Sequence, residues 1–425
     1  MNDNIKFLLI FFLSVSQILL LIGGFNWWID PYDIYHPEKY KSNNIVWMSK
    51  QLRLAKAYRI KQLRPQGIVI GASTTQLGID PDHSGWRENV YPRYNLALPG
   101  ASLYESFRYF QHSHELNPSK QLLIGLDFEA FNIFKQLSDD FNESYMIVSR
   151  DGKLQDNYLT TLTATLFSSS AIKASQKKML YRGRGTHFSN GTEFNEEIDS
   201  KPGKQRSAMM WSTTKYVSRL LMPPPGHRFC LDDGTRANSS FQYLRQILKT
   251  AKESEADVRL FIQPTHVYLL EVLKALGMME DYEKWQHRLI GLVEGVNKQY
   301  PKSLNFPLWD FSGYNSVTMD EVPPAEEPKR PMDWYYDVGH FKKSLGDMIQ
   351  DRIFNYNDAG RVVPKDFGMQ VNSKNIDSYQ REQRSKGMKY MLVHQKDINE
   401  LVGRVNVVKK KIREFDCGKV AMRKS

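Results

Sequence analysis

Cysteine is scarce in this chain: there are two, Cys230 and Cys417, among 425 residues. Structural zinc sites in sequences of this size usually show paired cysteines at Cys-x-x-Cys spacing, and none occurs here. No metal site is therefore expected through cysteine. The two residues could pair in an oxidising compartment, and two unpaired thiols fit the sequence at least as well.

Long apolar runs are equally scarce, and the single one lies at the N-terminus, which excludes a multi-span membrane protein. From Ile5 to Trp28 the run contains one charge, Lys6, and is about long enough to cross a hydrocarbon core. A cleaved signal peptide is the alternative, but the run leads into Trp27-Trp28 without a small-x-small cleavage site. We expect residues 1–28 to be an uncleaved single-pass anchor in the inner (cytoplasmic) membrane. The rest of the chain is then periplasmic, outside the cytoplasm.

The body of the chain has little net charge. Residues 361–425 hold ten Lys and six Arg against four Asp and three Glu, a net of +9, so only +2 of the total +11 belongs to residues 1–360. The basic segment is either a solvated C-terminal extension or a surface for anionic headgroups or an acidic polymer. Nucleic acid is not expected as a partner of a chain anchored outside the cytoplasm.

Residues 29–66 are expected to form a connector, in which residues 49–63 are predicted to be a helix. After it, apolar runs typical of strands alternate with helical patterns. Ser102 and Glu105 form a predicted capping box at the start of a helix over 102–116. The chain predicts an α/β domain over residues 67–355 with a three-layer, doubly wound, mostly parallel sheet, interrupted by an insertion at about 134–235 with one short helix near 158–166. The expected strands are 67–71, 94–98, 121–127, 258–263 and 304–310. The expected later helices are 239–253, 268–300 with a break at Gly277, and 344–354, followed by a basic extension over 356–425 with helices at 379–391 and 398–408.

Candidate site residues follow the predicted strands. Ser73 comes after the first strand, Gly100 after the second, and Asp127 and Asn132 after the third. The pair Asp337-x-x-His340 follows the last strand of the domain. Carboxyl ends of parallel strands share one edge of a sheet, so these residues could meet there.

A serine, a histidine and an aspartate are the residue types that acyl transfer needs. The serine attacks, the histidine takes its proton, and the aspartate orients the histidine. The bland alternatives are a helix cap for Ser73 and a helix-start pair for Asp337 and His340. His266, which ends another predicted strand, is the rival base and otherwise a candidate substrate-side or structural residue, and Asp127 is a second candidate substrate-side residue.

The order of these motifs resembles the SGNH (GDSL-type) hydrolase superfamily, whose sheet is flavodoxin-like. The resemblance is carried by Gly71-x-Ser73 with Gly78, by Asn95-Leu96-Ala97-Leu98-Pro99-Gly100, and by Asp337-x-x-His340 before a closing helix. Together with the anchor, the sequence is similar to periplasmic alginate O-acetylation and D-alanine transfer proteins. The superfamily places an asparagine two residues after a glycine in its third block, where this chain has Asp127 after Gly125.

The resemblance implies a role for each matching residue. Ser73 would be the nucleophile, His340 the general base and Asp337 its orienting partner. The backbone amides of Ser73 and Gly100 would form the oxyanion hole, with Asn132 standing in for the missing asparagine.

The resemblance also implies a reaction and its partners. We expect a serine acyltransferase or esterase that modifies a cell-surface polysaccharide, most simply by O-acetyl transfer, with no cofactor and with a membrane-bound acyltransferase as partner. The alternative is a non-catalytic polysaccharide-binding or assembly protein of the same fold.

Overall fold

The computed structural model describes residues 2–36, 52–181, 187–193, 205–232, 239–327, 330–410 and 417. The chain forms two compact units. Unit 1 comprises residues 1–64 and 139–189, and unit 2 comprises residues 65–138 and 190–425.

Unit 1 is helical. Its elements are α1 (Asp3–Ile29), α2 (Leu52–Leu63), the short η3 (Glu143–Tyr145), α5 (Tyr158–Leu162), η4 (Thr163–Phe167) and α6 (Ser169–Leu180). A small core formed by Tyr32, Leu54, Tyr58, Ala171 and Ala174 joins α2, α6 and the turn after α1. The predicted connector helix is present as α2, while residues 49–51 of that prediction lie outside the described residues.

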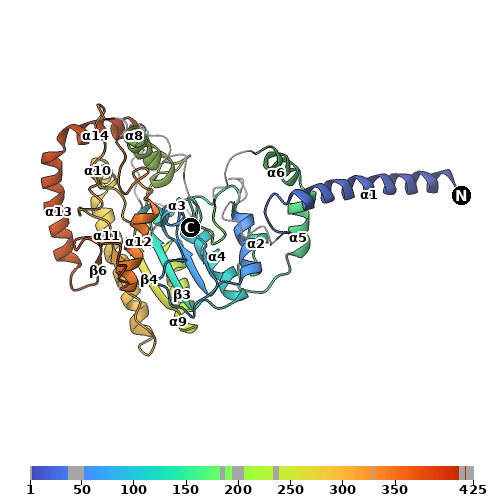
Figure 1. Cartoon of the computed structure of the whole chain (residues 1–425), viewed down its shortest axis with the longest axis horizontal. Helices are drawn as coiled ribbons and strands as arrows, with labels where there is room; N and C mark the ends of the chain where they lie inside the picture. The colour runs from blue at the N-terminus through green and yellow to red at the C-terminus, as the bar shows by residue number, and fades with distance from the viewer. Residues whose placement is uncertain are drawn as a thin grey trace. The chain divides into compact units, whose positions relative to one another are not determined.

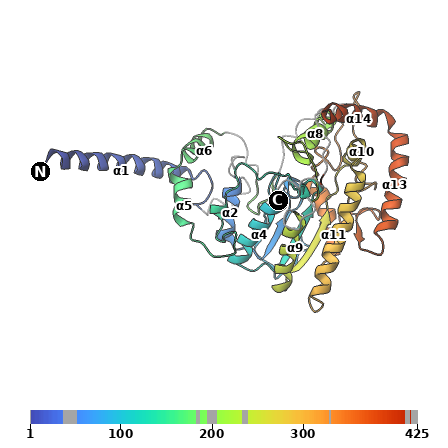
Figure 2. The same ribbon diagram turned by 180° about the vertical axis from the view of Figure 1, so that it is seen from behind.

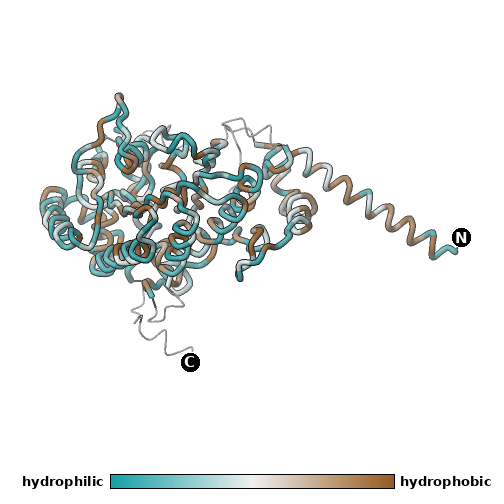
Figure 3. The backbone as a smooth tube through the Cα atoms, turned by 90° about the horizontal axis from the view of Figure 1, so that it is seen from below, coloured by the Kyte–Doolittle hydropathy of each residue, from teal (hydrophilic) through white to brown (hydrophobic). Residues whose placement is uncertain are grey.

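Helix α1 is long and apolar enough to cross a membrane, as the hydropathy colouring of Figure 3 shows for most of its length. The expected apolar N-terminal helix is thus confirmed, and by length and composition it could be a membrane anchor or a signal sequence. Helices α5 and α6 lie beside its C-terminal end (Figure 1).

Unit 2 is built on a six-stranded sheet with the order β2-β1-β3-β4-β5-β6. Strands β3, β4 and β6 are labelled in Figure 1. The strands are β1 (Gly67–Ile70), β2 (Arg93–Asn95), β3 (Gln121–Leu126), β4 (Asp257–Ile262), β5 (Leu308–Asp310) and β6 (Met369–Val371). The first five are parallel and β6 is antiparallel. The expected mixed α/β fold with a mostly parallel sheet is therefore confirmed, and β1 lies at the point where the strand order reverses.

Helices follow the parallel strands. They are α3 (Ser73–Gly78) and η2 (Phe128–Phe131), α4 (Leu103–Leu116), α8 (Gln205–Lys215) with η5 (Tyr216–Leu221), α9 (Phe241–Glu253), α10 (Val267–Leu276), α11 (Met279–Gln299) and α12 (Lys343–Phe354). Helices α4, α9 and α11 pack in a row, as Figure 2 shows, while α3 packs on α12. The predicted capping box of Ser102 and Glu105 is present at α4. Gly277 separates α10 from α11 as predicted, with a left-handed φ of 75° that suits glycine.

The basic C-terminal segment belongs to unit 2. Strand β6 pairs with β5, and α13 (Ile376–Val393) and α14 (Gln395–Lys409) follow it, with α14 packed on α10. Both helices were predicted, whereas β6 was not. The expected insertion is divided between the two units, because residues 139–189 join unit 1 and the rest joins unit 2. Cys230 and Cys417, which the sequence left open, form a disulfide.

Candidate functional site

Ser73 begins helix α3, three residues after the end of β1. Its hydroxyl lies 2.8 Å from Nε2 of His340, although the two residues are 267 positions apart in the chain. Nδ1 of His340 lies 2.9 Å from each carboxylate oxygen of Asp337. The three side chains therefore form one hydrogen-bonded series in the order serine, histidine, aspartate.

The Asp337 carboxylate also organises its own loop. Its Oδ1 accepts hydrogen bonds from the backbone N–H groups of Gly339 at 2.9 Å and His340 at 3.0 Å. The same oxygens thus fold the backbone and fix the imidazole. Neighbouring elements hold the loop at Val338, whose N–H donates to Ser212 of α8 and whose carbonyl accepts from the His266 N–H.

The serine loop and the histidine loop are tied directly. The Thr74 hydroxyl, next to Ser73, donates to the Gly339 carbonyl at 3.0 Å. Beyond them, α3 and α12 touch so closely that a Cβ on Gly346 would lie 1.7 Å from the Gly78 carbonyl oxygen. The short distance between Ser73 and His340 is therefore supported by two further contacts between the same segments.

The charges of the pair act on each other. Burial alone would lower the pKa of His340, but the Asp337 carboxylate outweighs it and raises that pKa above the ordinary 6.5. Burial alone would raise the pKa of Asp337, but His340 and the two backbone N–H groups hold it below 3.8. Side-chain exposures of 28% for His340 and 20% for Asp337 leave the imidazole within reach of solvent and small substrates.

The loop after β2 runs beside the end of β1. Leu96 N–H donates to the Val69 carbonyl and Leu98 N–H to the Gly71 carbonyl, which brings Gly100 towards the Ser73 turn. Gly100 has a left-handed φ of 63°. Among the described residues, nothing accepts a hydrogen bond from the Ser73 or Gly100 backbone N–H, so both donors are available.

Asn132 is used elsewhere. Its side-chain amide donates to the carbonyls of Leu221 at 2.9 Å and Arg228 at 2.7 Å, and its oxygen accepts from Phe134 and Cys230 N–H groups. Both amide hydrogens have partners, so Asn132 offers no side-chain donor to an oxyanion. The predicted stand-in role is not the one that this geometry favours.

His266 is also occupied by structural contacts. It is fully buried, its Nε2 lies 2.8 Å from the Asp320 carbonyl, and its Nδ1 accepts from the Tyr268 N–H at the start of α10. Burial lowers its pKa to about 4. The residue therefore caps α10 and supports the Val338 loop rather than facing Ser73.

Asp127 is a buried residue whose charge reaches His340. Burial, followed by the nearby Glu129 charge, raises its pKa well above 3.8, and its charge acts on His340. Gln263, its hydrogen-bonding neighbour, also donates to Thr75 of α3. Asp127 thus belongs to a buried polar layer behind the series.

Sequence reasoning did not single out two residues of α8, Lys215 and Trp211. Lys215 of α8 is close enough for its charge to oppose the rise in the pKa of His340. Trp211, one turn earlier, is 63% exposed and lies under the Lys215 ammonium at 5.0 Å. Both lie in the predicted insertion, whose sequence has no periodicity to mark them.

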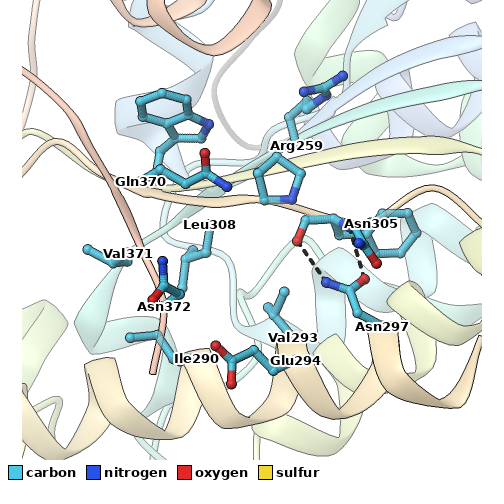
Figure 4. Close-up of a pocket in the computed structure, with 13 residues that line it drawn as sticks. Arg259, Ile290, Val293, Glu294, Asn297, Asn305, Leu308, Gln370, Val371 and Asn372 are labelled. Carbon is cyan, nitrogen blue, oxygen red and sulfur yellow. Dashed lines mark hydrogen bonds between the residues drawn. The ribbon is translucent and has the colours of Figure 1, made fainter. Parts of the chain in front are cut away.

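Two cavities among the described residues lie away from this series. One of about 470 Å³ lies between α11 and the start of β5, where Asn297 bonds both backbone groups of Phe306 (Figure 4). The other, of about 600 Å³, is lined by α10, α11 and α13. Neither includes Ser73 or His340 in its lining. Within the residues that the structure describes, no cluster of side chains has the composition of a metal site.

A scan against protein-family models and a search of curated proteins found no match to this chain. The fold and the hydrogen-bonded series therefore carry the functional argument.

Proposed function

We propose that this protein is an extracytoplasmic serine enzyme that transfers an acyl group, most simply acetyl, to or from a hydroxyl of a cell-surface polysaccharide. The observation that most supports this proposal is the hydrogen-bonded series of three side chains. Oγ of Ser73 lies 2.8 Å from Nε2 of His340, and Nδ1 of His340 lies 2.9 Å from the Asp337 carboxylate. A nucleophile, a base and an orienting carboxylate in hydrogen-bond contact are the working parts of serine acyl transfer.

The reaction proceeds in two halves. Ser73 Oγ attacks the acyl carbonyl carbon while Nε2 of His340 takes the hydroxyl proton, and the negative oxygen is held by the Ser73 and Gly100 N–H groups. As the bond to the leaving oxygen breaks, His340 gives it the proton, leaving an acyl-serine. A sugar hydroxyl, or water in hydrolysis, then repeats these steps in reverse, and Asp337 stabilises the transient imidazolium throughout.

The arrangement in space supports the SGNH resemblance. Ser73 begins α3 after β1, and Asp337 and His340 lie in the segment between β5 and α12, so all three follow the carboxyl ends of parallel strands of a 2-1-3-4-5 sheet. Asp127 takes the third-block place where the superfamily has asparagine, so the oxyanion hole proposed here rests on two backbone amides.

Two features support a location outside the cytoplasm. The Cys230–Cys417 disulfide is typical of oxidising compartments. In α1, Asn26 is fully buried and bonded to the Leu166 carbonyl and the Ser175 hydroxyl. Cleavage after the apolar run would remove a residue that unit 1 uses, which favours an uncleaved anchor.

A sugar acceptor is supported by an exposed tryptophan on α8, the helix whose Lys215 charge acts on His340. Trp211 exposes a flat aromatic face beside Lys215, and exposed aromatic side chains near a reactive centre suit stacking against sugar rings. A membrane-bound acyltransferase that supplies the acyl group completes the proposal, and its support is the family resemblance.

The second candidate is a polysaccharide-binding protein that has lost the chemistry. The observation that favours it is the third block, where Asp127 replaces the expected asparagine and Asn132 is committed to Leu221 and Arg228. Such a protein would keep the Ser73–His340 contact as a structural link.

An activated aryl acetate separates the two candidates. The wild-type protein should release the phenol and carry an acetyl group on Ser73, detected by peptide mass. Ser73→Ala should lose both, while Ser254→Ala, at the end of α9, should keep both. Turnover by wild type that equals Ser73→Ala, with no adduct, would exclude the enzyme.

A further inference from the structure

The last turns of α1 are built into unit 1. A Cβ on Gly23 would lie 2.7 Å from the Phe167 ring, and Asn26 bonds the Leu166 carbonyl at 2.7 Å. After the helix, the Asp30 carboxylate accepts from the N–H groups of Ile34, Tyr35 and His36. The segment Tyr158–Leu180, here named the α5–α6 hairpin, is therefore held against the end of the candidate span.

Helix α6 runs alongside α1 in the same direction. Ser175 bonds Asn26, and Lys178, one turn later, bonds the Asp30 carbonyl at 2.7 Å. The start of α6 consequently points back along the apolar run. Phe167, just before α6, packs at Gly23, six residues or about 9 Å before Ile29.

The α5–α6 hairpin exposes large apolar side chains. Tyr158 is 64% exposed, Leu159 72% and Leu180 68%, and at the end of α1 Trp28 is 67% exposed. Apolar groups collected on one small unit mark a surface that is covered in its working environment. Tryptophan and tyrosine beside an apolar span are typical of the membrane–water interface.

The charge of the α5–α6 hairpin has one sign. No Asp or Glu lies between Asn157 and Thr192, while the same stretch contains Lys173, Lys177, Lys178, Arg182 and Arg184. Lys173 and Lys177 are exposed on α6, and Arg182 and Arg184 lie outside the described residues. Exposed apolar groups with cations and no acids fit an anionic lipid surface.

We propose that the α5–α6 hairpin lies in the headgroup layer of the membrane that holds α1, as a second, interfacial membrane contact. The proposal rests on α1 being the anchor. Lipid is the occupant that the geometry favours, because the hairpin is continuous with the apolar helix and Phe167 lies level with Gly23 of that helix.

The test uses the full chain reconstituted in vesicles of zwitterionic and anionic lipid. Single cysteines replace Leu159, Ser170 or, as control in the same unit, Asp151, whose side chain is 62% exposed in the turn between Val148 and Leu154. Spin labelling without reductant leaves the Cys230–Cys417 disulfide intact. Collisions with oxygen, which concentrates in lipid, and with a water-soluble nickel chelate then give the depth of each label.

We expect labels at Leu159→Cys and Ser170→Cys to meet oxygen more often, and the nickel chelate at least about twofold less often, than the label at Asp151→Cys. Equal nickel access at all three positions would overturn the proposal. Labels shielded from both reagents would also overturn it, because they would show a protein cover.

Charge gives an independent arm. On anionic vesicles, K173A/K177A should increase the access of the nickel chelate to the label at position 170. The protein with both lysines should show the same increase when anionic vesicles are replaced by purely zwitterionic ones. No change in either comparison would contradict the lipid assignment. Flotation with the vesicles reports α1 separately. A protein that floats with an aqueous hairpin refutes only this inference, whereas one that does not float refutes the anchor as well.

Discussion

Asp337→Asn is the sharpest perturbation of the proposed chemistry, because it keeps the size of the side chain and changes its hydrogen bonding. The retained oxygen must keep accepting from the Gly339 and His340 N–H groups at 2.9 and 3.0 Å. The new NH₂ group then takes the place of Oδ2, 2.9 Å from Nδ1 of His340. Two N–H groups would repel there, so the imidazole moves its proton to Nε2.

The moved proton blocks the reaction. With a hydrogen on Nε2, which lies 2.8 Å from the Ser73 oxygen, His340 donates to the serine and cannot take its proton. The corresponding change in serine triads costs about 10⁴-fold in rate, or about 5.5 kcal/mol of transition-state stabilisation. We expect kcat/KM for aryl acetate to fall by about 10³–10⁴-fold with little change in thermal stability.

Asp333→Asn is the matched control. Asp333 lies four residues before Asp337 in the same segment, it is exposed, and its carboxylate bonds no histidine side chain among the described residues. It should retain activity within about threefold, as exposed amide changes do. The reasoning fails if Asp337→Asn keeps more than a tenth of wild-type kcat/KM, or if both variants lose activity equally.

Two further predictions concern pH and packing. The pKa of His340 is raised above 6.5 and the base must be neutral, so kcat/KM should rise with pH to a midpoint above 6.5. The Asp337→Asn variant should move that midpoint down, because burial alone lowers the pKa of His340. Stopped assays across pH 5–9 check both expectations. Gly346→Ala should lower the free energy of unfolding by about 3 kcal/mol or more, because the new Cβ meets the Gly78 backbone, which cannot turn aside. Gly295→Ala on α11, whose new Cβ meets nothing within 4 Å, should be neutral or stabilising. Chemical denaturation measures the free energy of unfolding of both variants, and equal values would contradict the packing argument.

Much of the sheet could be predicted because β1, β3 and β4 are short, mostly apolar runs that are buried almost throughout and are followed by glycine or a polar residue. Every side chain of β3 is buried, so its sequence shows no polar alternation and stands out from its surroundings. Strand β6 could not be predicted in this way. It has three residues, two of them exposed, and its existence depends on the edge that β5 presents.

The serine, histidine and aspartate could be predicted to meet because each follows a strand of a parallel sheet. Asn132 shows the limit of that reasoning. Its partners are backbone carbonyls at Leu221 and Arg228, which carry no side-chain signal in the sequence. Trp211 and Lys215 were missed for a related reason, since the fold of the insertion determines which of its residues approach His340.

The pairing of β6 with β5 has a practical consequence for shortened forms of the protein. A chain cut after α12 would lose the partner of β5 and expose the backbone groups of Leu308 and Asp310 at the sheet margin. Open strand margins recruit other chains, so such a truncation should favour aggregates over soluble monomers. Strand β6, which lies in the segment that the sequence marks as a basic extension, therefore closes this side of the sheet.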